Sequence, residues 1–329
     1  MTKAELIERA TASSLTSSWH WFNYHFKRYL LRRQEPMVES LLDALLQIDF
    51  VMPGYAAETL DRLANIGGRE KFHGHFDQLI QTFAEIFVIA QLSAVDWQEA
   101  AAFDFEPGAN LGRPNPEIAI QLAYTTISIE VKAPSWNTIK HLRSKEGLQL
   151  LARLSKELFA DEQPVLPRDN SIKDFLLSAS TKFRAMRERS AKSHYGILVI
   201  VWDDYIQEPL SALLSPASGL FTQQSFLKDA SGSVETFAGV DGVILLRHLH
   251  QMVRSTAERD FIDNCRHTFD YGSPDAFPPK AFVQNPWSQQ FVPSNILKTF
   301  QARPWYELLG AEYVPAELIH WIVNGSSAE

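Results

Sequence analysis

Two runs of alternating apolar and polar residues near the middle of the chain have the pattern of neighbouring β-strands. In the first run, residues 118–123, isoleucine and leucine alternate with alanine and glutamine. In the second run, residues 126–132, three branched apolar side chains share one face, whereas Ser128, Glu130 and Lys132 share the other. The second strand is therefore predicted to have one core face and one polar face that carries a carboxylate and an amine.

Tyr124 and Thr125 form a tight connection between the two runs, and Glu117 stands directly before the first of them. If the runs pair as a hairpin, Glu117, Glu130 and Lys132 meet at one end of the sheet. Two hard oxygen ligands for a divalent cation would then lie beside an ammonium group. This combination suits the hydrolysis of a phosphodiester bond.

The remaining pattern of the central part predicts an alternation of helices and strands. The predicted elements are a helix over 72–92, a strand over 101–105, the two strands above, helices over 139–158 and 172–189, and strongly apolar strands over 195–202 and 239–246. This α-β-β-β-α-β order with additions favours an α/β fold with a mixed sheet rather than a regular doubly wound sheet.

The two ends of the chain have different patterns. Residues 1–68 have apolar residues at helical spacing and end at a Gly-Gly break, which predicts a helical N-terminal extension. Residues 251–329 are rich in proline and aromatic residues and are expected to form loops and short helices packed on the core. We therefore expect a core over 69–250 between these two extensions.

Glu85 is the only charged residue between Ala84 and Ala90 of the helix predicted over 72–92. It is expected near the interior, where a carboxylate without a cation or hydrogen-bond donors is costly. A metal ion or Lys132 would provide that partner. A structural ion pair is the alternative reading of Glu85.

A helical glutamate, an apolar strand, a Pro-acid pair and an apolar strand with Glu-x-Lys, in this order, resemble the PD-(D/E)xK nuclease superfamily. The resemblance covers about residues 70–250. It implies that Glu117 and Glu130 bind Mg²⁺ or Mn²⁺, that Lys132 orients or deprotonates the attacking water, and that Glu85 supports the metal site. Lys182, on the following predicted helix, is a candidate for contact with the scissile phosphate. The chain departs from the common pattern because Glu117 stands where aspartate is usual.

The resemblance implies a restriction-endonuclease-like fold and a metal-dependent nuclease that acts on nucleic acid, with DNA as the expected substrate. The alternative is a catalytically inactive nuclease-fold module that binds nucleic acid or a protein partner. Homodimerisation is left open by the sequence.

Composition narrows the class of protein without identifying the partner. The 329 residues carry a net charge of −8, which argues against a surface coated in positive charge for indiscriminate nucleic-acid binding. Basic residues nevertheless cluster around residues 27–33, 140–145 and 182–192, where they suit either phosphate contacts or solvated helix faces. No apolar run approaches the roughly 18 residues of a membrane helix, and a lone cysteine excludes internal disulfides, so a cytoplasmic protein without a membrane partner is expected.

Other polar or aromatic groups favour structural roles. His73 and His75 have no other His or Cys at ligand spacing nearby and are interpreted as exposed imidazoles at a helix N-terminus. Asp203 and Asp204 follow an apolar strand, where acids can be ligands in α/β sheets, but turn initiation before Tyr205 is the favoured interpretation, and His248 and His250 have the same two interpretations. The aromatic, basic segment 19–33 is expected to pack on the neighbouring domain, with base stacking or membrane association as alternatives.

Overall fold

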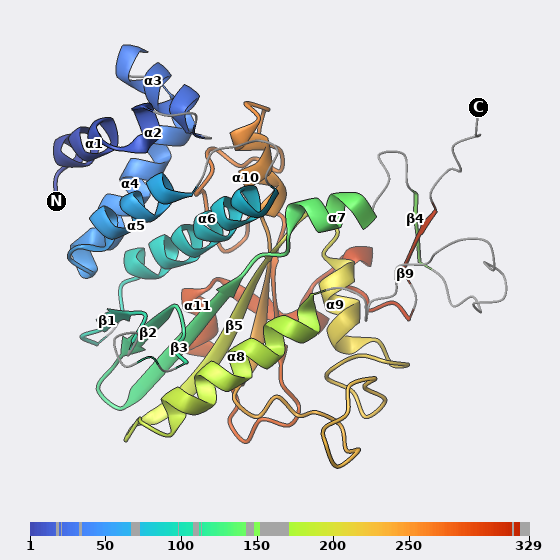
Figure 1. Ribbon diagram of the computed structural model, residues 1–329. Coiled ribbons are helices and arrows are strands. Elements are labelled where there is room, and N and C mark those ends of the chain that lie inside the picture. The colour runs from blue at the N-terminus through green and yellow to red at the C-terminus, as the bar shows by residue number, and fades with distance from the viewer. Residues whose placement is uncertain are drawn as a thin grey trace, which may run out of the picture.

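A seven-stranded mixed β-sheet runs through the middle of this α/β fold, and helices flank it (Figure 1). The computed structural model describes residues 1–17, 20, 22–32, 35–66, 73–97, 99–107, 112, 114–142, 148–151, 171–317 and 319–322. In order across the sheet, the strands are β1 (Ala102–Phe105), β2 (Ile118–Gln121), β3 (Thr125–Lys132), β5 (Ser193–Trp202), β6 (Gly242–Arg247), β7 (Lys280–Gln284) and β8 (Ala302–Pro304).

The directions of the central strands place several strand ends that carry polar residues along one edge of the sheet. β1, β2 and β3 are antiparallel neighbours, β5 and β6 run parallel to β3, and β7 returns antiparallel to β6 with β8 parallel to it. The carboxyl ends of β3, β5 and β6 therefore meet at the same edge, together with the start of β7. This edge is the usual position for ligand sites in parallel sheets.

Helices α1 to α5 form the N-terminal extension, and Figure 1 shows them grouped beside α6. The helices are α1 (Lys3–Ala12), α2 (Ser14–Ser17), α3 (Asn23–Arg32), α4 (Pro36–Val51), α5 (Tyr55–Asn65), α6 (His73–Ala94), α7 (Trp136–Leu142), α8 (Ile172–Arg187), α9 (Gln207–Leu214), α10 (Leu249–Thr256) and α11 (Ser294–Thr299). None of the described helices is long and apolar enough to span a membrane.

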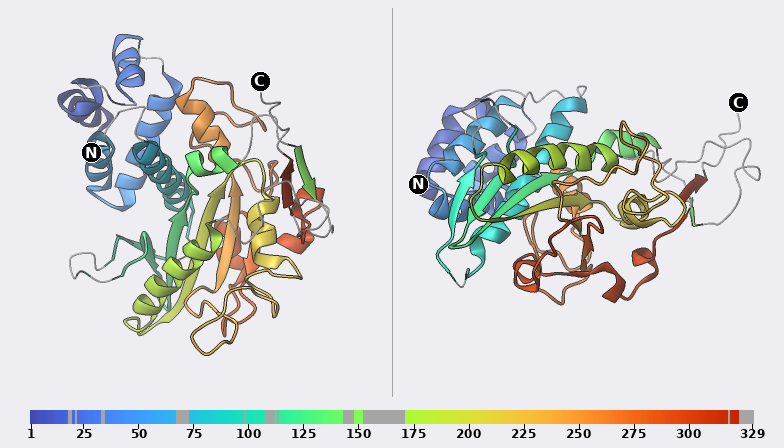
Figure 2. Two further views of the ribbon diagram at one scale, coloured as in Figure 1. Left: turned by 45° about the vertical axis from the view of Figure 1, so that its right-hand side comes forward. Right: turned by 90° about the horizontal axis from the view of Figure 1, so that it is seen from below.

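Helix α8 crosses the face of β3 and β5 that carries the polar residues of β3. The helix lies so close to β5 that only glycine fits at position 196. A Cβ atom on Gly196 would lie 2.6 Å from the ring of Phe183 and 2.4 Å from the carbonyl oxygen of Gly239. Figure 2 shows α8 on one face of the sheet and the C-terminal segment around α11 on the other. The glycine thus sets the depth at which α8 sits over the strands.

The structure confirms most of the predicted elements and corrects two of them. The helix predicted over 139–158 is wrong, since α7 ends at Leu142 and residues Leu148–Leu151 form strand β4, which pairs with β9 (Ile319–Ile322); residues 143–147 and 152–158 lie outside the described residues. The C-terminal part contains loops, short helices and the 3₁₀ turns at Trp305–Glu307 and Ala311–Tyr313 as expected. It also supplies β7 and β8, because the apolar run Ala281–Val283 completes the sheet beside β6.

Packing of the N-terminal aromatic residues is confirmed for Phe22, Phe26 and Tyr29, whereas Tyr24 is exposed. Phe22 and Phe26 are buried, and the ring of Phe22 lies 5.3 Å from that of Phe83 on α6. These rings hold the helical extension against the helix that carries Glu85. Trp19, Trp21 and Arg33 lie outside the described residues.

Candidate active site

The hairpin of β2 and β3 brings Glu117 and Glu130 to opposite positions. Ile118 pairs with Ile129 in antiparallel register, so the next pair outward is Glu117 with Glu130. The carbonyl oxygen of Glu117 accepts a hydrogen bond from the backbone N–H of Glu106 (2.9 Å), which fixes the chain before β2. Side chains opposite each other on antiparallel strands have Cβ atoms about 5 Å apart. The predicted pairing of the two carboxylates is therefore present in the backbone.

Glu130 is fully buried and has two lysine partners. Its Oε1 atom lies 2.7 Å from Nζ of Lys132 and 2.6 Å from Nζ of Lys182. The pairing with Lys182 follows from the path of α8 across the polar face of β3. The Oε2 atom of Glu130 is buried and has no hydrogen-bond partner among the described residues. One oxygen of this carboxylate is thus neutralised and the other is available to a ligand.

Glu85 occupies a buried position on α6 but is held by different partners. Its Oε2 atom forms an ion pair with Arg62 of α5 (2.8 Å), and its Oε1 atom accepts a hydrogen bond from Nε2 of Gln81 (2.9 Å). Glu85 therefore forms a structural ion pair, the alternative interpretation given above. Its cationic partner is Arg62 rather than a metal ion or Lys132. Arg62 belongs to the N-terminal extension, and no pattern in the sequence singled it out.

Gln81 connects the helix of Glu85 to the end of the strand that carries Glu130. Its amide nitrogen donates to the carbonyl oxygen of Val131 (2.9 Å), and its amide oxygen accepts from the N–H of Ala133 (2.8 Å). Together with the bond to Glu85, these contacts fix α6 relative to β3. Sequence reasoning missed Gln81, although its position one helical turn before Glu85 is a signal that could have found it.

The charges around Glu117 oppose its ionisation. Burial, followed by the negative charges of Glu85 and Glu130, raises the pKa of Glu117 to about 8, although Lys182 and Lys132 offset part of the effect. A carboxyl group with this pKa is mostly protonated at neutral pH. A bound cation would reverse the preference by stabilising the carboxylate.

Lys132 remains charged at neutral pH. Burial alone would lower its pKa, but the charge of Glu130, its hydrogen bond to Glu130 and the charge of Glu117 together raise it above the usual lysine value. Without a substrate, Lys132 is therefore a fixed positive charge and a hydrogen-bond donor.

The residues present fit a divalent cation at Glu117 and Glu130. The unpartnered Oε2 atom of Glu130 offers one hard oxygen, and Glu117 offers a second whose charged form needs a cation. Glu85 does not complete a set of three carboxylates, because ligand oxygens of Glu85, Glu117 and Glu130 do not all lie within 4.8 Å of one another in this part of the chain. Of the three acids expected around the metal, only Glu117 and Glu130 are thus brought opposite each other by the strand register.

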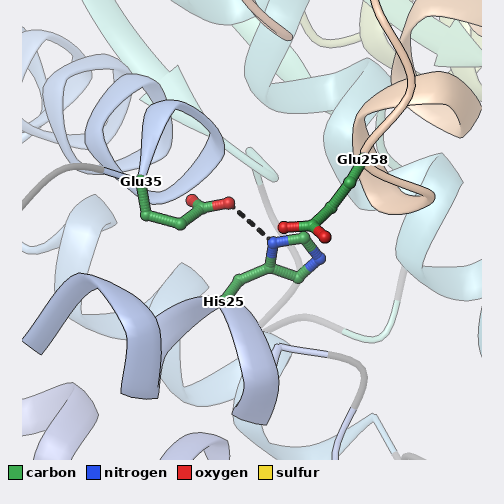
Figure 3. Close-up of side chains that lie close together, drawn as sticks. All are labelled: His25, Glu35 and Glu258. Atoms are coloured by element: carbon green, nitrogen blue, oxygen red, sulfur yellow. Dashed lines mark hydrogen bonds and ion pairs between the residues drawn. The ribbon is translucent and has the colours of Figure 1, made fainter. Parts of the chain in front are cut away.

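A second group of potential ligands, His25, Glu35 and Glu258, is already satisfied by protein partners (Figure 3). Glu35 is the N-cap of α4: one of its oxygens bonds to Nδ1 of His25 (2.7 Å), and the other accepts from the N–H of Val38 (2.8 Å). Glu258 forms an ion pair with Arg28. The buried His25–Glu35 pair therefore links α3 to the start of α4, and the exposed Glu258 ties the turn after α10 to α3 through Arg28.

Several residues of the predicted basic clusters have intramolecular partners. Arg187 donates to Asp241 (2.7 Å) and to the carbonyl oxygen of Ala238 (2.9 Å), and Nζ of Lys192 donates to the carbonyl oxygen of Leu122 (2.5 Å). These contacts favour structural roles for part of the cluster over 182–192. The side chains of Lys140, Arg143 and Lys145, and that of His73, lie outside the described residues.

The turn reading of the acids after β5 holds for Asp203, which is buried and accepts from the N–H of Tyr205 (3.1 Å). His248 is also structural, because it stacks on Phe87 with ring centroids 4.0 Å apart and bonds to the carbonyl oxygen of Thr268.

Comparison of the chain with protein-family models, with curated proteins and with solved structures found no match. Functional inference therefore depends on the geometry of the site.

Proposed function

We propose that this protein is a divalent-metal-dependent nuclease of the PD-(D/E)xK type, with a restriction-endonuclease-like fold and DNA as its substrate. The observation that carries the proposal is the placement of Glu117 opposite Glu130 on paired strands, with Lys132 bound to Glu130 and on the same face of β3. The order of α6, β1 to β3, α8 and β5 around this site supports it.

In the proposed site, Glu117 and the Oε2 atom of Glu130 hold Mg²⁺ or Mn²⁺. The bound cation supplies Lewis-acid chemistry, in that it lowers the pKa of a water molecule and offsets charge on the phosphoryl oxygens. Glu85 is a positioning residue, since Arg62 and Gln81 occupy its oxygens. Gln81 keeps the end of β3 at a fixed distance from α6.

Lys132 orients the attacking water through its ammonium group and stabilises the negative charge that develops on phosphorus-bound oxygens. Its raised pKa favours this role over that of a general base. Lys182 is a partly exposed cation that already reaches the buried Glu130, so a phosphate at the mouth of the site could take it as a second partner.

The test is cleavage of supercoiled plasmid, single-stranded DNA and RNA by the purified chain with Mg²⁺ or Mn²⁺. Cleavage should require the metal and be lost in Glu130→Gln and Lys132→Ala. Glu58→Gln and Lys298→Ala change exposed residues of the same types and should leave it unchanged. Metal-independent cleavage, or full activity in both site variants, would refute the proposal.

The alternative is an inactive nuclease-fold module that binds nucleic acid or a protein. It is favoured by one observation, namely that Glu85 and one oxygen of Glu130 are already neutralised by protein cations. It predicts no cleavage by the wild-type chain and binding that is insensitive both to Mg²⁺ and to Glu130→Gln.

A further inference from the structure

Asp204, His250 and Asp263 converge at the carboxyl edge of the sheet and share no residue with the site described above. Asp204 follows β5, His250 is the second residue of α10, and Asp263 lies in the segment between α10 and β7. One ligand atom from each lies within 4.8 Å of the others. Nδ1 of His250 is 2.9 Å from Asp204, and Nε2 is 3.4 Å from Asp263.

Asp204 and Asp263 lie at ion-pair distance from His250, but the geometry of these contacts does not form hydrogen bonds. Both ring nitrogens of His250 and the Oδ2 atom of Asp263 are buried and have no hydrogen-bond partner within the described residues. The side chain of His250 is only 6% exposed, so bulk water does not solvate it. Buried polar atoms without partners are uncommon in folded proteins, and each one needs a cause. One ion that binds these atoms would satisfy several of them together.

The local charge favours a dication. Asp204, Asp263 and Glu312 surround the guanidinium of Arg247 at 3.9, 3.7 and 4.0 Å. Apart from the imidazole, the three carboxylates and the one guanidinium carry a local charge of −2. These distances are too long for hydrogen bonds, so Arg247 does not saturate the carboxylates. A divalent ion would bring the cluster to neutrality.

The position gives an ion access and room for water ligands. Exposure of the side chains increases from 6% at His250 through 17% at Asp263 to 41% at Asp204, which opens the cluster to solvent on one side. Asp263 and Arg247 also line a cavity of about 130 Å³. A water molecule occupies about 30 Å³ in the liquid, so the cavity has room for waters that complete a coordination shell.

We propose that Asp204, His250 and Asp263 form a binding site for a divalent transition-metal ion, separate from the proposed nuclease chemistry. Imidazole with carboxylates suits Zn²⁺ and related ions, whereas Mg²⁺ prefers all-oxygen ligands. The site would tie the end of β5 to α10 and to the segment after it. It differs from the group around His25, whose atoms already have protein partners.

The test is titration of the full chain with Zn²⁺ by calorimetry, in excess Mg²⁺ to occupy the proposed nuclease site. The wild-type chain should bind one equivalent of Zn²⁺. His250→Ala and Asp263→Asn should weaken this binding by at least about tenfold. His25→Gln, the matched change in the other group, and Glu130→Gln should retain it.

A second variant keeps the test valid if removal of the buried imidazole disturbs folding. The side chain of Asp204 is 41% exposed, the most exposed of the three, so Asp204→Asn should fold and still bind Zn²⁺ more weakly than the wild type. Co²⁺ provides a spectroscopic check, because nitrogen and oxygen ligands give it visible absorption bands that His250→Ala should remove. Absence of Zn²⁺ binding by the wild type, or equal affinity in His250→Ala and Asp204→Asn, would overturn the proposal and identify the cluster as an ion-pair network around Arg247.

Discussion

Replacement of Glu117 by glutamine tests the electrostatics of the proposed nuclease site directly. Glu117 has a pKa of about 8 in the folded chain, compared with 4.5 for an unperturbed glutamate. Between these values the folded state binds a proton that the unfolded state has released. The contribution of Glu117 to the free energy of unfolding is therefore largest at low pH and decreases as the pH rises towards 8.

The magnitude follows from the linkage relation. One pH unit corresponds to about 1.4 kcal/mol for one proton, and the slope flattens near the folded pKa. Between pH 6.5 and pH 8 the free energy of unfolding of the wild-type chain should fall by about 1.5 kcal/mol more than that of Glu117→Gln. Since Glu117 keeps partial exposure, this figure is an upper estimate.

The other buried groups with strongly lowered pKa values affect stability mainly outside the range from pH 6.5 to pH 8. Burial lowers the pKa of His194 to about 4 and that of His248 to about 3, so their effect on stability ends near pH 6.5, where the unfolded histidines lose their protons. Burial lowers the pKa of Lys280 to about 8, and this group makes stability rise only above that value. Subtraction of the Glu117→Gln curve removes the contributions that the two chains share.

The assay is urea denaturation of both chains from pH 5.5 to pH 9, with and without saturating Mg²⁺. A cation at Glu117 and Glu130 should lower the pKa of Glu117, so Mg²⁺ should stabilise the wild type more at pH 8 than at pH 6.5. Parallel pH profiles for the two chains would refute the raised pKa. A Mg²⁺ effect that is identical in Glu117→Gln would refute its role as a ligand.

Three further changes test the supports of the site. Gln81→Ala should lower the rate of DNA cleavage by about tenfold while DNA binding is retained, because the end of β3 loses its link to α6; equal rates would contradict a positioning role. Arg62→Met should lower the free energy of unfolding by about 2 kcal/mol, and adding Glu85→Gln should recover part of it in urea denaturation; strictly additive losses would show that the pair is not coupled. Gly196→Ala should destabilise by about 1–3 kcal/mol through its clash with Phe183, and an unchanged urea midpoint would contradict the close packing of α8.

The site residues could be predicted because their order follows the chain and their faces follow strand alternation. Glu130 and Lys132 share a face of β3 through the two-residue period alone, and Glu117 meets Glu130 because a short turn fixes the hairpin register. Lys182 could only be suggested, since its contact depends on the crossing angle of α8 over β3.

Long-range partners were not accessible to the same reasoning. Arg62 lies 23 residues before Glu85 on another helix, and only the packing of α5 against the rest of the fold joins them. The cluster of Asp204, His250 and Asp263 draws on three segments, so spacing along the chain gave no motif. The strand at Leu148–Leu151 was missed because its partner, β9, lies at the far end of the chain.

The N-terminal extension contributes side chains that contact the candidate site. Arg62 neutralises Glu85, and Tyr55 packs against Phe105 of β1 with ring centroids 5.0 Å apart, so α5 closes the side of the site formed by α6 and the hairpin. Without Arg62, Glu85 would remain as a buried charge beside Glu117 and would raise the energy of the ionised form of Glu117 further. The charge state of the proposed metal ligand therefore depends on a residue outside the segment that resembles the nuclease core.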